Sequence, residues 1–241
     1  MSGSGLLVKV LGFAHVTFCV PTEFRFQDRN QGLLLDQVIP NHVAKHPLQL
    51  SPHVLHGIKV YASPFHAALI EFCSYHHPKR RLLASWTVML KYNWMVRSRS
   101  RLRSKSFTPE FLNGLHSLFG IKGAKTPHSL RVPTLSRSKF VELSNCRFGP
   151  RFKSKLDQIG PVSLAFWVDT LDTFSIGELG LREVASLATD VFELEVDGRV
   201  LSIVFLRLEG VLIELIARKP MDRPESSGFS SDANIPGSLA P

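Results

Sequence analysis

The amino-acid sequence predicts an α+β fold in which two βαβββ units enclose a basic insertion. Two pairs of matching segments, one pair at the start and one at the end of the units, indicate an internal repeat. Within each unit, apolar runs alternate with turn signals, as expected for short strands. The net charge also distinguishes the insertion from the two units. Residues 76–156 hold 18 Lys and Arg against two acidic residues, a balance of +16, whereas the rest of the chain holds 11 basic and 18 acidic residues, a balance of −7.

The first strands of the two units match each other. "HVTFCVPT" (15–22) aligns with "SLAFWVDT" (163–170), so that Phe18 falls on Phe166 and each segment ends in threonine. Both are short apolar runs closed by a turn or cap residue, which is typical of a buried strand that leads into a helix.

The last strands also match. "ALIEFCS" (68–74) aligns with "VLIELIA" (211–217), and Glu71 falls on Glu214, each preceded by Leu-Ile. A carboxylate is costly to bury without a partner, so twin glutamates in apolar strands predict a shared function. The alternative is that each glutamate faces solvent on a half-buried strand, and this alternative stays open.

The first unit is predicted over 1–75. Its helix is expected somewhere within 23–33, and its middle strands are expected at "LLLDQVI" (33–39) and "GIKVYA" (57–62). A loop rich in Pro and His separates these two strands, and its prolines argue against a helix there.

The second unit is predicted over 157–219. Capping oxygens after the first strand favour a helix over about 172–188. The alternating run that follows turns at Asp197-Gly198, a strong two-residue hairpin signal. Residues 220–241 are rich in Pro, Ser and Gly and are predicted to be a disordered tail.

The basic insertion is predicted over 76–156 as a partly disordered linker. Cations alternate with serine in "RSRSRLRSKS" (97–106), and three aromatic residues lie just upstream. A polyanion such as RNA or DNA is therefore an alternative partner, bound through 79–106. Residues 107–120 predict a short amphipathic helix, with Pro109 at its start and a glycine at its end.

Composition sets the wider limits. With 241 residues, 44% of them hydrophobic, the chain is long enough for a globular core. It has no apolar run long enough to cross a membrane and no signal peptide, so we expect a soluble, intracellular and cytoplasmic protein. The three cysteines are scattered, which predicts free thiols rather than a disulfide framework.

Two βαβββ units with a histidine or serine in the first strand and a glutamate in the last resemble the vicinal oxygen chelate superfamily, which includes glyoxalase I, methylmalonyl-CoA epimerase and extradiol dioxygenases. The resemblance covers about 12–75 and 159–218, and "GPVSLAFWVDTLD" and "EGVLIELIA" are its most characteristic pieces. It implies one cupped mixed sheet in which the two units face each other.

The resemblance also implies a site. Carried over by position, His15, Glu71 and Glu214 would bind one divalent cation, with Ser163 at the fourth position. Imidazole and carboxylate ligands suit Fe, Mn, Ni, Co or Zn. The implied activity is that of a metal-dependent lyase, isomerase or dioxygenase acting on a small oxygen-rich substrate, with Glu71 and Glu214 as catalytic residues.

Ser163 departs from the pattern of this superfamily, because a neutral hydroxyl is a poor ligand where His, Gln or Glu is usual. The serine favours a second hypothesis, a non-catalytic descendant of the fold that binds a small ligand or a protein. A third hypothesis, a nucleic-acid-associated protein, rests on the basic insertion alone.

Overall fold

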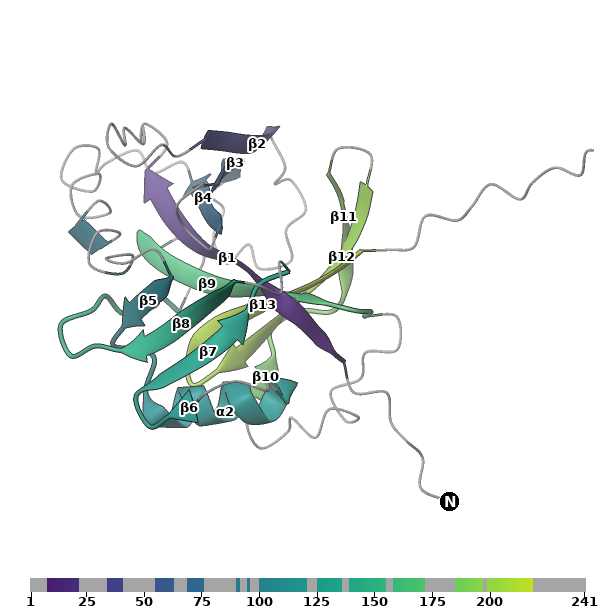
Figure 1. Ribbon diagram of the computed structural model, residues 1–241. Coiled ribbons are helices and arrows are strands. Elements are labelled where there is room, and N and C mark those ends of the chain that lie inside the picture. The colour runs from purple at the N-terminus through teal and green to yellow at the C-terminus, as the bar shows by residue number, and fades with distance from the viewer. Residues whose placement is uncertain are drawn as a thin grey trace, which may run out of the picture.

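The computed structural model describes residues 8–21, 34–40, 55–62, 69–75, 90–91, 95, 100–120, 125–135, 139–154, 158–171, 185–196 and 199–218. These residues are mostly β-sheet with few helices, arranged in two mixed sheets (Figure 1). In this part of the chain no helix has the length and apolar character needed to cross a membrane.

The larger sheet has nine strands in the order β10-β12-β13-β9-β1-β4-β3-β2, and β11 also pairs with β12. The strands from the first half of the chain are β1 (Val10–Pro21), β2 (Leu34–Pro40), β3 (Leu55–Ala62) and β4 (Leu69–Tyr75). Those from the second half are β9 (Gly160–Val168), β10 (Ala185–Leu187), β11 (Phe192–Val196), β12 (Arg199–Leu208) and β13 (Val211–Arg218).

The two halves of this sheet have the same strand order. In each half the first and last strands are parallel neighbours, β1 with β4 and β9 with β13. The halves join where β1 pairs antiparallel with β9. This is the order that two βαβββ units would give, although the helix predicted within 23–33 lies outside the described residues.

The helix predicted over 172–188 extends too far. Ala185–Leu187 form β10, because they pair with the far end of β12 instead of continuing a helical turn. The earlier part of that prediction, 172–184, lies outside the described residues. The predicted hairpin is consistent with the antiparallel register of β11 and β12, in which Val196 lies opposite Arg199.

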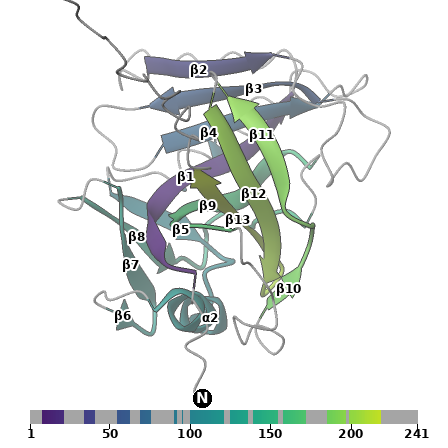
Figure 2. The ribbon, with the colours of Figure 1, turned by 90° about the vertical axis from the view of Figure 1, so that its right-hand side faces the viewer.

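The larger sheet is strongly curved. Its two ends, β2–β3 and β11, project to the same side, whereas α2 lies on the opposite side (Figures 1 and 2). The sheet therefore has one face enclosed between its two ends and another face covered by α2 and the smaller sheet.

The segment between the two halves is folded where the structure describes it. It contains β5 (Arg101–Ser104), α2 (Pro109–Phe119), β6 (Lys125–Thr126), β7 (Ser129–Pro133) and β8 (Phe140–Asn145). The predicted helix is confirmed: Thr108 caps its start by accepting a hydrogen bond from the amide of Phe111, and Gly120 ends it with a φ of 54°. The four strands form the smaller sheet, in the order β5-β8-β7-β6.

A shared hydrophobic core fastens this segment to the larger sheet. Phe166 of β9 is fully buried, with its ring centroid 5.3 Å from Phe119 of α2 and 5.5 Å from Phe13 of β1. The two sheets also meet at a bridge between Phe13 and Thr134. This close approach requires Gly12, since a Cβ there would lie 2.6 Å from the carbonyl carbon of Thr134.

We expect Phe166→Ala to lower the free energy of unfolding by about 3–5 kcal/mol, because it removes a ring that contacts both α2 and β1. Urea denaturation measures the change. Phe148→Ala is the control, since Phe148 is 72% exposed and its loss should change stability by less than about 0.5 kcal/mol. Equal effects of the two changes would contradict a shared core.

Candidate functional site

The site residues lie at the centre of the larger sheet, where its two halves meet. In the β1–β4 register, Thr17 lies opposite Glu71, and in the β1–β9 register it lies opposite Ser163. His15 and Glu214 both lie opposite Ala165 of β9. Residues opposite each other share a face of the sheet, as do residues two apart on one strand. The predicted site residues therefore share one face.

The register also relates the site residues of the two halves. His15 lies opposite Leu69 at the start of β4, and Ser163 lies opposite Leu212 at the equivalent place in β13. This agrees with the sequence alignment of His15 with Ser163.

His15 lies between the two glutamates. Its Nε2 is 3.5 Å from Oε2 of Glu71 and 3.4 Å from Oε2 of Glu214. His15 and Glu214 are each 7% exposed, and Glu71 is half-buried. Three residues from three strands and from both halves of the chain thus form one ionisable cluster.

Burial and charge act in opposite directions on His15. Burial lowers its pKa, but attraction to Glu71 and then to Glu214 outweighs burial and raises the pKa from 6.5 to about 8. Burial raises the pKa of the Glu71 carboxyl, the charge of Glu214 adds to this rise, and His15 and Thr17 oppose it. The cluster therefore holds a proton on His15 at neutral pH.

The two glutamates are not equivalent. Thr17 donates a hydrogen bond from its Oγ1 to Oε1 of Glu71, at 3.1 Å. The corresponding neighbour of Glu214 is Ala165, which has no hydroxyl group to donate. Glu71 is thus held through both oxygens, whereas within the described residues Glu214 makes a polar contact through Oε2 alone, with His15. Sequence analysis did not single out Thr17, although a hydroxyl two residues after His15 must lie on the same face of β1.

Ser163 is buried at the position symmetric with His15. It is 1% exposed, and its Oγ has no hydrogen-bond partner among the described residues. Nε2 of His15 is also without a well-formed hydrogen bond, because its carboxylate contacts exceed the usual length. Buried polar atoms usually have a hydrogen-bond partner, so Oγ of Ser163 and Nε2 of His15 are available to bind a ligand, an ion or a water molecule.

The donor set suits a divalent cation in its chemistry, but its arrangement is that of an ion-pair cluster. Donors about 2.0–2.2 Å from one tetrahedral ion lie about 3.3–3.6 Å from each other, which matches the two separations at His15. However, the described residues contain no group of three or more His, Cys, Asp or Glu side chains placed so that it could hold a metal ion. The protonated imidazole occupies the position between the carboxylates.

Apolar side chains surround the cluster on the same face. Phe205 of β12 lies opposite Glu214 and is 3% exposed, and Phe192 of β11 stacks on it with ring centroids 6.2 Å apart. The other members of this apolar group include Ala165, Ile203, Leu212 and Ile216. An apolar surrounding lowers the local dielectric constant and strengthens the charge interactions of the cluster.

Comparison with solved structures gives similarities of low score. Methylmalonyl-CoA epimerase from Mycobacterium tuberculosis is 14% identical over 91% of this chain and 94% of its own, with a TM-score of 0.39. Glyoxalase I from Zea mays is 10% identical over 88% of this chain and 68% of its own, with a TM-score of 0.34. A variant of 4-hydroxymandelate synthase from Streptomyces coelicolor is 12% identical over 95% of this chain and 65% of its own, with a TM-score of 0.29.

Similarities at this level do not assign the chain to a family. No family model matches the chain, and no curated protein matches it. The glyoxalase-like interpretation therefore rests on the strand order and register of the larger sheet.

We expect the His15 ring to titrate near pH 8 in protein treated with a chelator. Because this folded-state pKa lies above the unfolded value of 6.5, the imidazolium stabilises the fold below pH 6.5. That stabilisation, about 2 kcal/mol, is lost as the pH rises through 8. Histidine resonances followed by NMR measure the midpoint, and His15→Gln assigns the signal. Glu71→Gln should lower the midpoint, and a wild-type midpoint at or below 6.5 would contradict the described cluster.

Proposed function

We propose that this glyoxalase-like chain is an enzyme that moves a proton at a carbon beside a carbonyl group, in a small oxygen-rich substrate. The observation that carries the proposal is the cluster itself: an imidazole between two carboxylates, 3.4 and 3.5 Å away, on a buried face that also carries the apolar side chains of Phe205 and Leu212. Proton abstraction next to a carbonyl needs a base and a positive group near the oxygen that becomes negative. The cluster contains both.

Glu214 is the proposed base. Within the described part of the chain its carboxylate has no tether like the one from Thr17 to Glu71, so it can accept a proton from the substrate carbon without breaking a hydrogen bond within the cluster. The electron pair of the broken C–H bond then moves onto the carbonyl oxygen. Return of the proton from Glu214 to the neighbouring carbon, with transfer of the hydroxyl proton of the intermediate to the oxygen that becomes the new alcohol, completes an isomerisation. Return to the original carbon, after the Glu214 proton has exchanged with solvent, exchanges the C–H hydrogen.

His15 is proposed to stabilise the negative oxygen. With its pKa raised to about 8, the imidazole carries a positive charge at neutral pH. Glu71 holds that charge in position, and Thr17 in turn orients Glu71. In this scheme Glu71 and Thr17 are positioning residues, and Glu214 and His15 act on the substrate.

A solvent-exchange assay tests this proposal without knowledge of the substrate. Small hydroxy ketones, keto acids and acyl thioesters are incubated with the protein in D₂O, and NMR follows the loss of C–H signals. We expect catalysed exchange in at least one compound class. Glu214→Gln should slow it by about 10²–10⁴-fold, because it removes the base.

Thr17→Val and Thr17→Ser serve as the matched pair for the positioning role. The valine variant should reduce the exchange rate and lower the midpoint of the pH–rate profile. The serine variant should restore both the rate and the midpoint. Exchange that is absent throughout, or unaffected by Glu214→Gln, would overturn the catalytic proposal and favour the non-catalytic ligand-binding alternative.

A divalent cation at the same cluster is the second candidate. The separations around His15 and the unpartnered Oγ of Ser163 favour it. Because no three such side chains among the described residues are placed to hold an ion, His15, Glu71 and Glu214 would have to shift in order to hold Fe, Mn, Ni, Co or Zn. The bound ion would then supply Lewis-acid polarisation of a substrate oxygen. To bind, the cation would have to displace the proton from His15.

Ser163→His should strengthen cation binding, because it adds an imidazole at the position symmetric with His15. We expect Mn, Co, Ni or Zn to raise the melting temperature of Ser163→His more than that of the wild type, since the ion binds only the folded state. The double variant Ser163→His/Glu214→Gln is the control and should lose this gain. Identical melts of all three proteins with and without metal would exclude the cation site.

A further inference from the structure

Two lysines come together where β9 begins. Lys91 donates a hydrogen bond from its Nζ to the carbonyl oxygen of Ile159, at 3.3 Å. A Cβ atom built on Gly160 would lie 3.4 Å from Nζ of Lys91 and 3.6 Å from Cε of Lys153. The two side chains thus converge over the backbone of Gly160, although they belong to segments far apart in the sequence.

This pair of charges is not neutralised within the described residues. Both lysines are half-buried, and neither forms an ion pair with a carboxylate there. Burial lowers the pKa of Lys91, and the charge of Lys153 lowers it further. Two partly desolvated ammonium groups without a counter-charge disfavour the folded state, and an anion between them would remove that cost.

The pair lies at one end of the face that carries the ionisable cluster. Gly160 is opposite Cys19, and Ser163 is opposite Thr17, so the pair is about 10 Å from Ser163 along β9. Lys153 is held there by a hydrogen bond from its amide to the carbonyl oxygen of Pro161, at 2.8 Å.

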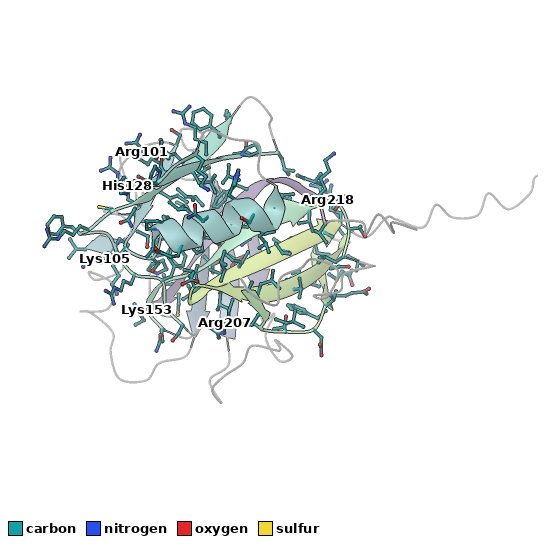
Figure 3. All side chains as sticks on the ribbon, turned by 90° about the horizontal axis from the view of Figure 1, so that it is seen from below. Arg101, Lys105, His128, Lys153, Arg207 and Arg218 are labelled. Atoms are coloured by element: carbon teal, nitrogen blue, oxygen red, sulfur yellow. The ribbon has the colours of Figure 1, made fainter. Side chains whose placement is uncertain are left out.

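A third cation approaches the same end of this face. Arg207 lies opposite Leu212, which lies opposite Ser163, so its side chain starts on the face of the cluster. Its Nη1 donates to the carbonyl oxygen of Ser154, at 2.9 Å, next to Lys153. Lys153 and Arg207 lie along one edge of the molecule in Figure 3, away from Arg101 and His128.

We propose that Lys91 and Lys153 form an anion subsite, which receives a carboxylate or phosphate group of the ligand that binds at the His15, Glu71 and Glu214 cluster. The statement that one ligand reaches both places rests on the proposed function; the binding of an anion by the lysine pair does not. A separation of about 10 Å implies an elongated substrate, with the reacting carbon near the cluster and the anionic group at its far end.

Thermal melts of the full-length chain test the subsite with inorganic phosphate, against sodium chloride at equal ionic strength. We expect phosphate at roughly ten times its dissociation constant to raise the melting temperature by about 3–6 °C. Lys91→Met and Lys153→Met keep the apolar stems and should weaken phosphate binding at least about tenfold. Without phosphate, both variants should melt at or above the wild-type temperature, because the repulsion is gone.

Lys105→Met is the matched control, since it removes one exposed lysine from the same basic segment. It should keep the phosphate response, and so should Glu214→Gln. A parallel series with acetate distinguishes a carboxylate subsite from a phosphate subsite. A response that is absent in the wild type, or reduced equally by Lys105→Met and Lys153→Met, would overturn the proposal.

A single-stranded oligonucleotide completes the test. Binding that Lys105→Met and Lys153→Met weaken alike, with no specific phosphate response, would assign the basic residues to a diffuse nucleic-acid surface and overturn the subsite. The two proposals also fail separately. Phosphate binding without proton exchange would leave the subsite standing and remove the catalytic function, whereas exchange without phosphate binding would do the reverse.

Discussion

The antiparallel pairing of β1 with β9 is the constraint on which the rest of the site depends. It joins the two halves of the sheet, and each of these strands has the last strand of its own half on its other side. Within this four-strand centre, His15 reaches the carboxylates of both Glu71 and Glu214. A slip of one residue in the register would turn His15 to the opposite face, so the pairing determines the chemistry as well as the fold.

The balance of charge within the cluster follows from its burial. Two carboxylates near each other in an apolar surrounding would be costly, and a positive charge on His15 offsets their repulsion. The strand order is nearly symmetric, but the side chains are not: Thr17 donates a hydrogen bond to Glu71, whereas Ala165, at the corresponding position beside Glu214, has no hydroxyl group. The matching strand order of the two halves thus brings Glu71 and Glu214 close to His15. The difference between Thr17 and Ala165 then gives the two glutamates different surroundings.

The segment predicted as a basic insertion, 76–156, has a structural role that its charge alone does not reveal. Its apolar residues, among them Phe111 and Leu115, share one core with the strands of the larger sheet, so its described residues cover the face opposite the cluster. One of its cations, Arg101, is paired with Glu142 at 2.9 Å. Lys91 and Lys153 are brought together over Gly160 instead. The positive charges of this segment therefore differ in their surroundings: Arg101 is neutralised by an ion pair, whereas Lys91 and Lys153 lie near each other.

The sequence by itself determined the twin strands, the match of Glu71 with Glu214 and the short helix after Pro109, because local periodicity and capping residues specify these features. It could not determine the end of the helix predicted over 172–188, where pairing of Ala185 with Leu208 gives a strand. Nor could it find the tether from Thr17 or the convergence of Lys91 and Lys153. Only the tertiary structure decided these, since contacts between distant segments depend on strand register and packing, which leave no local pattern in the sequence.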